Sequence, residues 1–174
     1  MPQLRQRAQR MPASPIRRLV PYADEARTRG VHVHHLNIGQ PDIATPPAMI
    51  ETYQKYDEKV LAYGPSLGLP ELRHEVANFY QQSGLPVAFE DISVCFGGSE
   101  AVRFALDAVT DPGDEVIVSE PFYANYAGFA CSSGLTVKPV AASAQDGFHL
   151  PPNEAFEAVI TEKTKASIVC TPGN

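Results

Sequence analysis

The sequence predicts an α/β fold in which a mostly parallel β-sheet is flanked by helices. Short apolar runs rich in β-branched residues, such as residues 115–118, alternate along the chain with segments of helical spacing. Tight turns separate these segments, as at Asp111-Pro112-Gly113-Asp114. Each parallel connection needs a crossover, which is usually a helix, so this alternation is typical of a parallel sheet.

Proline and glycine mark the boundaries of the expected elements, because proline favours the first turn of a helix and glycine favours its end. In the first half, a helix ends at Gly30, an alternating strand follows, and prolines open the next two helices. We therefore expect helices at residues 21–29, 45–59 and 70–83, strands at residues 31–38 and 92–96, and a turn-rich loop at residues 63–68.

The second half contains the clearest strand–helix–strand pattern. Its first helix is expected to bury Ala101, Phe104, Ala105 and Ala108, which recur at helical spacing. Here we expect helices at residues 99–109, 124–132 and 151–160, and strands at residues 115–118, 135–140 and 166–170. The last strand is followed by only four residues, which predicts a domain cut in its middle, with an exposed edge that favours aggregation.

Composition excludes several functional classes. The 174 residues carry a net charge of −6, which argues against nucleic acid or an anionic membrane as the main partner. No apolar run approaches the roughly 18 residues that a membrane span needs. The Arg-rich start is read as a basic arm that packs on another subunit or on the domain surface, with a targeting segment as the alternative.

Neither the cysteines nor the histidines predict a metal site. Cys95, Cys131 and Cys170 form no CxxC pair, so we expect small buried apolar side chains in a reducing compartment, with a catalytic thiol as the alternative. His32 and His34 share a face of the expected strand, but no third ligand lies nearby in the sequence, so exposed histidines are favoured over zinc.

The most informative chemistry lies where the strand at residues 92–96 runs into Gly97-Gly98-Ser99 and a helix. Free N–H groups at a helix start converge on one point and bind anions. Downstream, Phe122, Tyr123 and Tyr126 offer a surface for a flat ring. Together these features predict a pocket for a phosphorylated aromatic cofactor.

Alternatives remain for this junction. Glycines at a strand–helix junction also serve positive φ or close packing. The sequence contains neither GxGxxG nor a Gly-Lys-Ser/Thr P-loop, which disfavours a nucleotide-binding module. Glu100 is expected to point away from the anion, because its carboxylate would repel a phosphate.

Six motifs occur in a fixed order along nearly the whole chain. They are Leu36-Asn37-Ile38-Gly39-Gln40-Pro41-Asp42, Tyr63-Gly64-Pro65-Ser66-Leu67-Gly68, Gly97-Gly98-Ser99-Glu100-Ala101, Asp111-Pro112-Gly113-Asp114-Glu115, Pro121-Phe122-Tyr123-Ala124-Asn125-Tyr126 and Pro172-Gly173-Asn174. In this order the chain resembles the N-terminal half of the class I/II aminotransferases. These are fold-type I enzymes that depend on pyridoxal 5′-phosphate (PLP), and the aspartate-aminotransferase-like members are the most similar.

The resemblance implies roles for residues at matching positions. The backbone N–H groups of Gly98, Ser99 and Glu100, with the Ser99 hydroxyl, would hold the PLP phosphate. Tyr123 would stack on the pyridine ring. The alternative for Tyr123 is an ordinary core or dimer contact.

Three further positions carry implied roles. Asn174 would hydrogen-bond the phenolate oxygen O3′, Gly39 would lie against the substrate carboxylate, and Tyr63 would reach the phosphate of the other subunit. From the residues alone, the favoured interpretations are a turn former for Asn174 and a brace of the Gly-Pro loop for Tyr63. The resemblance also implies a division into residues 1–45, an N-terminal arm and small-domain segment, and residues 46–174, the start of the PLP-binding large domain.

The resemblance implies an aminotransferase that moves an amino group between an amino acid and a 2-oxo acid, as a cytoplasmic homodimer in amino acid biosynthesis. The Schiff-base lysine of the family lies downstream of Pro-Gly-Asn, so the chain as given is expected to be inactive. Its own lysines match no such motif: Lys55, Lys59, Lys138, Lys163 and Lys165. The alternatives are a PLP-dependent lyase or synthase of the same fold, and a non-catalytic truncated fragment.

Overall fold

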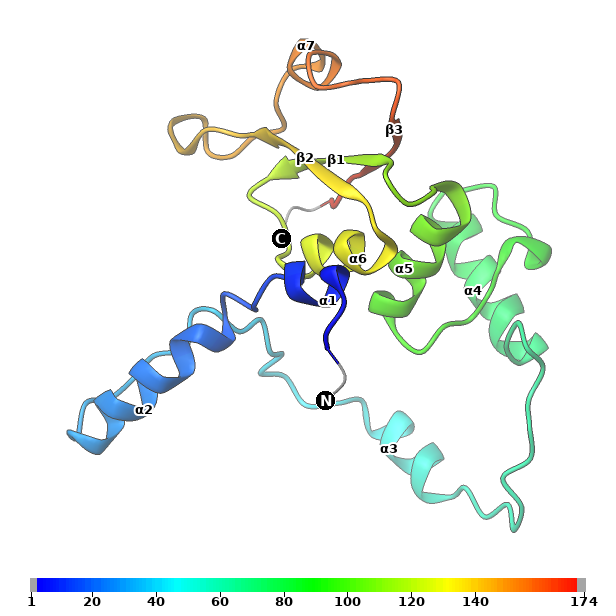
Figure 1. Cartoon of the computed structure of the whole chain (residues 1–174). Helices are drawn as coiled ribbons and strands as arrows, with labels where there is room; N and C mark the ends of the chain where they lie inside the picture. Colours follow the sequence, from blue (N-terminus) through cyan, green and yellow to red (C-terminus); the bar gives the residue numbers. More distant parts are fainter. Residues whose placement is uncertain (1–2, 172–174) are drawn as a thin grey trace. The chain divides into compact units, whose positions relative to one another are not determined.

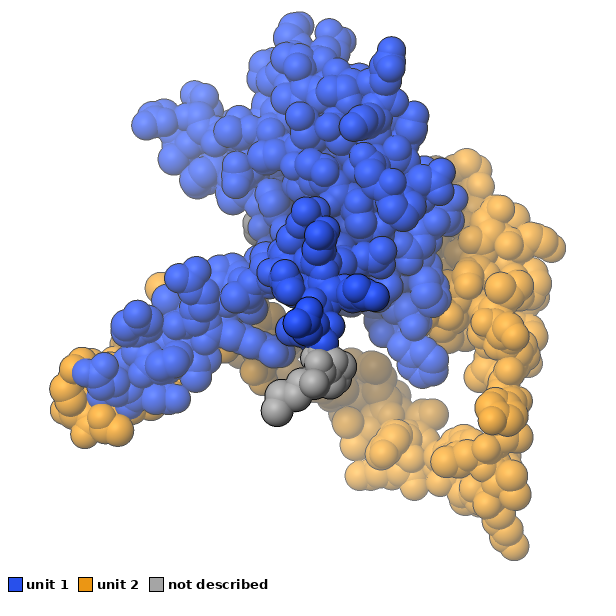
Figure 2. Space-filling view, in the orientation of Figure 1, with its two compact units in different colours: residues 1–25, 96–174 blue, residues 26–95 orange. Residues whose placement is uncertain are grey.

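The computed structural model describes residues 3–171, which form two compact units. Among these described residues, unit 1 comprises residues 3–25 and 96–171, and unit 2 comprises residues 26–95 (Figure 2). The described elements are α1 (Gln6–Arg10), η1 (Arg17–Leu19), α2 (Val20–Thr28), α3 (Pro47–Gln54), α4 (Pro70–Gln82), η2 (Phe89–Asp91), α5 (Gly98–Val109), β1 (Glu115–Glu120), α6 (Asn125–Ser133), β2 (Thr136–Ala141), η3 (Ala144–Asp146), α7 (Asn153–Glu157) and β3 (Thr164–Ile168).

A parallel three-stranded sheet with the order β2-β1-β3 forms the centre of unit 1 (Figure 1). The central strand β1 is the most apolar, and Val116, Ile117 and Val118 are each at most 3% exposed. Helices α5 and α6 pack on the sheet through a core of Leu106, Ala130 and Leu135 around Val116. The predicted α/β class is therefore confirmed.

Helix α5 buries a different face from the one we expected. Leu106 is 4% exposed and Val102 packs against the same core, whereas Phe104 is 56% exposed. Ala101, Ala105 and Ala108 are also exposed, so this part of the prediction was wrong. The cause is that α5 meets the sheet through its Val102 and Leu106 side, which leaves the alanine-rich side exposed.

Two expected strands are not formed. At residues 92–96 the backbone is engaged elsewhere: the Val94 N–H donates to the Leu67 carbonyl at 2.9 Å and Arg73 Nε donates to the Ile92 carbonyl at 2.8 Å. At residues 31–38 the chain turns at Leu36 and Asn37, and the Val31 N–H closes the end of α2. The helices expected at residues 45–59 and 151–160 are shorter, as α3 and α7.

Unit 2 is organised around a buried arginine. Arg73 of α4 is 8% exposed, and its Nη2 donates to the Phe89 carbonyl at 3.0 Å. Its guanidinium carbon lies 4.0 Å from the centroid of the Phe89 ring. Two carbonyls and an aromatic face thus compensate the desolvated charge.

The N-terminal arm packs on the surface of unit 1, which is one of the two expected placements. Arg7 Nη1 donates to the Ser132 carbonyl at 3.1 Å, and Cys131 Sγ donates to the Arg7 carbonyl at 3.7 Å. Cys131 and Cys95 are half-buried. Cys170 is exposed, because it follows the end of β3, so the expected burial of this thiol was wrong.

The predicted division into residues 1–45 and 46–174 stays a prediction, since the two units are defined by contacts within this chain alone. Among residues 3–171, no helix combines the length and the apolar character of a membrane span. The same residues contain no group of three or more metal-ligating side chains.

Candidate functional site

The start of α5 is an uncapped helix N-terminus. Gly97 adopts φ +89°, which favours glycine, and no side chain caps the first turn. A Cβ at Gly97 or Gly98 would meet no atom within 4 Å, so the approach to the backbone is open. The first intrahelical bond runs from the Ala101 N–H to the Gly97 carbonyl, which leaves the N–H groups of Gly98, Ser99 and Glu100 at the uncapped end.

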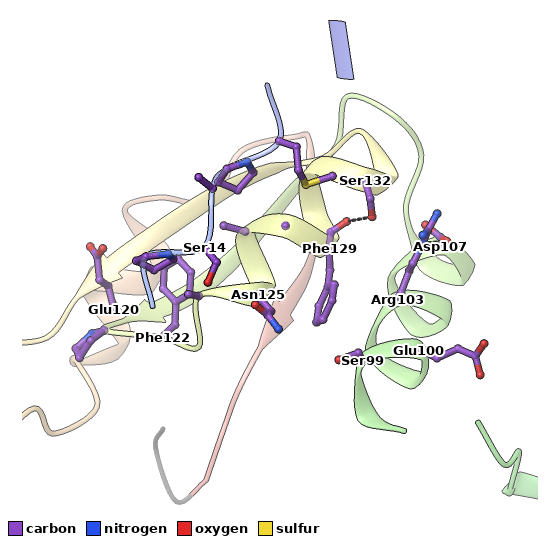
Figure 3. Close-up of a pocket in the computed structure, with 18 of the residues that line it drawn as sticks. Ser14, Ser99, Glu100, Arg103, Asp107, Glu120, Phe122, Asn125, Phe129 and Ser132 are labelled. Carbon is purple, nitrogen blue, oxygen red and sulfur yellow. Dashed lines mark hydrogen bonds and ion pairs between the residues drawn. The ribbon is translucent and has the colours of Figure 1, made fainter. Parts of the chain in front are cut away.

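Glu100 is directed back along the chain. Its Oε2 accepts a hydrogen bond from the Phe96 N–H at 2.7 Å. Figure 3 shows Ser99 and Glu100 projecting from opposite sides of α5. The carboxylate therefore accepts a local backbone hydrogen bond, but Glu100 also lines the cavity that Ser99 lines, so its expected direction away from an anion stays a prediction.

Ser99 opens into a cavity of about 980 Å³ within unit 1. Its walls come from residues 11–15, from α5, from the end of β1 and from α6. Figure 3 shows Ser99 facing Asn125 and Phe129 of α6. On this wall Arg103 Nε and Asp107 Oδ2 form an ion pair at 3.5 Å, so the arginine charge is offset locally.

Tyr123 lines a second cavity of about 500 Å³ at the carboxyl ends of β1 and β3. Pro121 and Phe122 line both cavities. The Tyr123 ring meets Tyr126 edge-on, with centroids 5.6 Å apart and planes at 90°. The structure thus places Tyr123 next to the cavity that Ser99 lines, but not in it.

Tyr126 lies at the same end of the sheet and lines the same cavity as Tyr123. The pKa of the Tyr126 phenol is raised above its ordinary value. The main cause is burial, and a side-chain hydrogen bond with Cys170 is the second. The Tyr126 ring packs nearly parallel to Phe122, with ring centroids 6.4 Å apart.

The remaining predicted residues belong to other parts of the chain. Gly39 and Tyr63 belong to unit 2, and both are exposed. Asn174 lies outside the described residues.

The described residues fit a phosphorylated ring. A dianionic phosphate suits an open, uncapped helix start with a neighbouring serine hydroxyl. A flat ring suits the aromatic walls of the adjoining cavity. The two recognition elements lie on successive parts of one βα layer, on either side of Pro121 and Phe122.

Comparison with known proteins decides the family. Residues 31–174 match the family described as aminotransferase class I and II. The chain belongs to the class I and II aminotransferases. This family depends on PLP, which agrees with the cofactor expected from the sequence.

Several of the similar proteins are named aspartate aminotransferases. The aspartate/prephenate aminotransferase of Thermus thermophilus is 36% identical over 152 residues, which cover 86% of this chain and 39% of that protein. An aspartate aminotransferase of Geobacillus stearothermophilus is 32% identical, over 87% of this chain and 39% of its own length.

Solved structures show the same fold. The Thermus thermophilus aspartate aminotransferase with maleate has a TM-score of 0.84 and 34% identity, covering 100% of this chain and 46% of that one. The Thermotoga maritima aspartate aminotransferase has a TM-score of 0.86 and 29% identity, over 98% and 46% of the two chains. The chain therefore spans less than half the length of these family members.

Sequence reasoning missed the role of Asn125. Its Nδ2 donates to Tyr123 Oη at 2.6 Å, which ties the two cavity walls together. The residue lies within the quoted aromatic motif, but no spacing rule showed where its amide would point.

Proposed function

We propose that this chain forms the phosphate- and ring-binding wall of a PLP-dependent aminotransferase that moves an amino group between an amino acid and a 2-oxo acid. The observation that carries the proposal is the uncapped start of α5, open beside the Ser99 cavity. Family membership supports the reaction class. All three similar proteins described above carry aspartate in their names, the Thermus thermophilus protein as an aspartate/prephenate aminotransferase, which favours a dicarboxylic amino donor.

Each residue contributes binding or orientation. The N–H groups of Gly98, Ser99 and Glu100 and the Ser99 hydroxyl neutralise the phosphate, and the helix dipole adds to their field. Tyr123 offers its face to the ring. Bound PLP supplies the electron sink for chemistry at the amino acid Cα.

The roles proposed for Gly39, Tyr63 and Asn174 follow from family motifs rather than from contacts in the described residues. Gly39 would lie against the substrate carboxylate, Tyr63 would reach a second subunit's phosphate and Asn174 would bind O3′. Tyr63 is fully exposed, which suits a side chain that acts outside its own subunit. We propose a cytoplasmic homodimer with a biosynthetic role on this basis.

The alternative function is that of a PLP-dependent lyase or synthase of the same fold, because the same phosphate-binding helix start is compatible with several PLP chemistries. The chain as given is proposed to bind PLP without turning over substrate. None of its five lysines stands in a Schiff-base motif.

The proposal is tested by equilibrium dialysis of the chain with PLP, pyridoxal and inorganic phosphate. We expect PLP to bind more tightly than pyridoxal and phosphate to compete with it. Ser99→Ala should weaken PLP binding severalfold, since one charge-assisted hydrogen bond is lost. Ser132→Ala is the matched control, because Ser132 lines the same cavity but its hydroxyl already donates to the Phe129 carbonyl at 2.7 Å.

Equal binding of PLP and pyridoxal would overturn the phosphate site. Borohydride reduction followed by peptide mapping adds a separate test. Fixation of PLP on one specific lysine of this chain would overturn the proposal that the chain binds PLP without a Schiff-base partner.

A further inference from the structure

Asn125 stands at the boundary of the two cavities. It is the first residue of α6 and lines the larger cavity with Ser99, while Tyr123 lines the smaller one. Its Nδ2 donates to Tyr123 Oη at 2.6 Å, so one amide connects the phosphate side to the ring side. In Figure 3 the Asn125 side chain lies between Phe122 and Phe129.

Tyr123 has two restraints within the described residues of unit 1. The edge of its ring meets Tyr126 at 90°, which fixes the plane, and the hydroxyl is tied by Asn125. The hydroxyl oxygen lies on the axis of the last side-chain torsion, so the hydrogen bond leaves the ring plane to the Tyr126 contact. It restrains instead the first torsion, which decides where the far end of the ring lies.

We propose that Asn125 is a positioning residue that presets the Tyr123 ring for stacking on the cofactor. The inference rests on the proposed function and goes one step further. It assigns a role to a residue that is not among the proposed contacts of the cofactor and that acts through Tyr123. Stacking contributes most to the binding free energy when the aromatic side chain is already oriented. The entropy of ordering that side chain is then lost before the ligand binds.

The chemistry of the amide suits this role. A carboxamide carries two N–H donors and an acceptor oxygen on a short stem. The Tyr123 bond uses one of those N–H groups. Asn125→Asp keeps the shape but replaces the donor with a charged acceptor beside the phosphate side of the site.

A double-mutant cycle on the chain tests the proposal. The variants are Asn125→Ala, Tyr123→Phe and both together, with dissociation constants measured for PLP and pyridoxal. We expect Asn125→Ala to weaken both ligands about fivefold, the loss of one ordinary hydrogen bond. In the Tyr123→Phe background the same change should have no effect, because the tether is already absent. Asn78→Ala, on an exposed face of α4, is the control.

Two results would overturn the positioning role. Additive losses in the cycle would mean that Asn125 acts independently of Tyr123. A loss with PLP but none with pyridoxal would mean that Asn125 contacts the phosphate directly.

A readout without ligand separates this inference from the proposed function. In NMR spectra of isotope-labelled tyrosine rings, Asn125→Ala should broaden or shift the Tyr123 signals and Asn78→Ala should not. If the unliganded chain shows this change but binds no PLP, the proposed function fails and the tether stands. An unchanged Tyr123 signal overturns the tether whether or not PLP binds.

Discussion

The N–H of Phe96 donates to Glu100 Oε2 at 2.7 Å, across the turn at which α5 begins. The carboxylate therefore stabilises the chain entering the helix without capping the helix itself. We predict that Glu100→Ala costs about 1 kcal/mol of local stability, a usual value for losing a side-chain bond at a helix start. Glu100→Gln should cost less, because its amide oxygen still accepts the bond.

Native-state hydrogen exchange at the Phe96 amide measures this directly. Exchange should accelerate in Glu100→Ala and remain closer to the parent in Glu100→Gln. Unchanged protection in both variants would show that the bond contributes nothing to the turn.

Arg73 should be the most sensitive charged residue of unit 2. Its guanidinium is buried and donates to two backbone carbonyls, so Arg73→Ala leaves both acceptors unpaired. We predict a loss of about 2–3 kcal/mol, measured by hydrogen exchange of the α4 amides. Arg103→Ala is the control, because its pair with Asp107 is 50% and 43% exposed and is worth about 0.5 kcal/mol or less. Equal effects would contradict the burial of Arg73.

Gly68 is required for a close approach in unit 2. A Cβ there would lie 2.5 Å from Val94 Cγ2, on a backbone with φ +100°. Gly84 has φ +82° but open space around it. Both alanine variants share the backbone strain, so we predict that Gly68→Ala costs about 1–3 kcal/mol more than Gly84→Ala.

The clash at Gly68 can be relieved. Val94 Cβ would also lie 2.6 Å from the new Cβ, so the whole Val94 side chain has to be removed, and adding Val94→Gly to Gly68→Ala should recover part of the loss, as measured by hydrogen exchange in unit 2. Additive losses in the double variant would exclude the steric cause.

Helix α5 should be held to the sheet by Leu106 rather than by Phe104. Leu106→Ala removes a side chain that is 4% exposed and should cost about 2–5 kcal/mol in unit 1. Phe104→Ala, at a site 56% exposed, should cost much less despite the larger side chain. Urea denaturation of the two variants gives the comparison, and the reverse order would restore the face expected from the sequence.

Strand β1 could be predicted from sequence because it is buried on both faces and contacts neighbours on both edges. Such a strand is an uninterrupted apolar run, and turn residues bound it. Residues 92–96 present a similar run but form no strand. An apolar run indicates burial, whereas a strand also needs a neighbouring strand to hydrogen-bond with. Here the Leu67 carbonyl accepts from the Val94 N–H, and Arg73 donates to the Ile92 carbonyl.

The face of α5 was ambiguous for a related reason. Alanines and apolar residues occur on both sides of this helix, so helical spacing does not fix which side meets the sheet. Leu106 became the core residue because its side chain reaches Val116 and Ala130.

The candidate site was only partly predictable. The Gly97-Gly98-Ser99 junction predicts an open helix start from sequence alone, because few residues other than glycine adopt the positive φ that Gly97 has there. The Asn125–Tyr123 bond depends on side-chain direction, which no short-range pattern encodes. Ser99 and Tyr123 were expected in one pocket, whereas the structure gives each its own cavity on either side of Pro121 and Phe122.

The central claim is that the start of α5 binds the cofactor phosphate, and amide NMR of the chain tests it most directly. Addition of PLP should shift the backbone signals of Gly98, Ser99 and Glu100, and pyridoxal should leave them nearly unchanged. Inorganic phosphate should move the same three signals in the same direction. PLP-dependent shifts that spare these three amides would contradict the account.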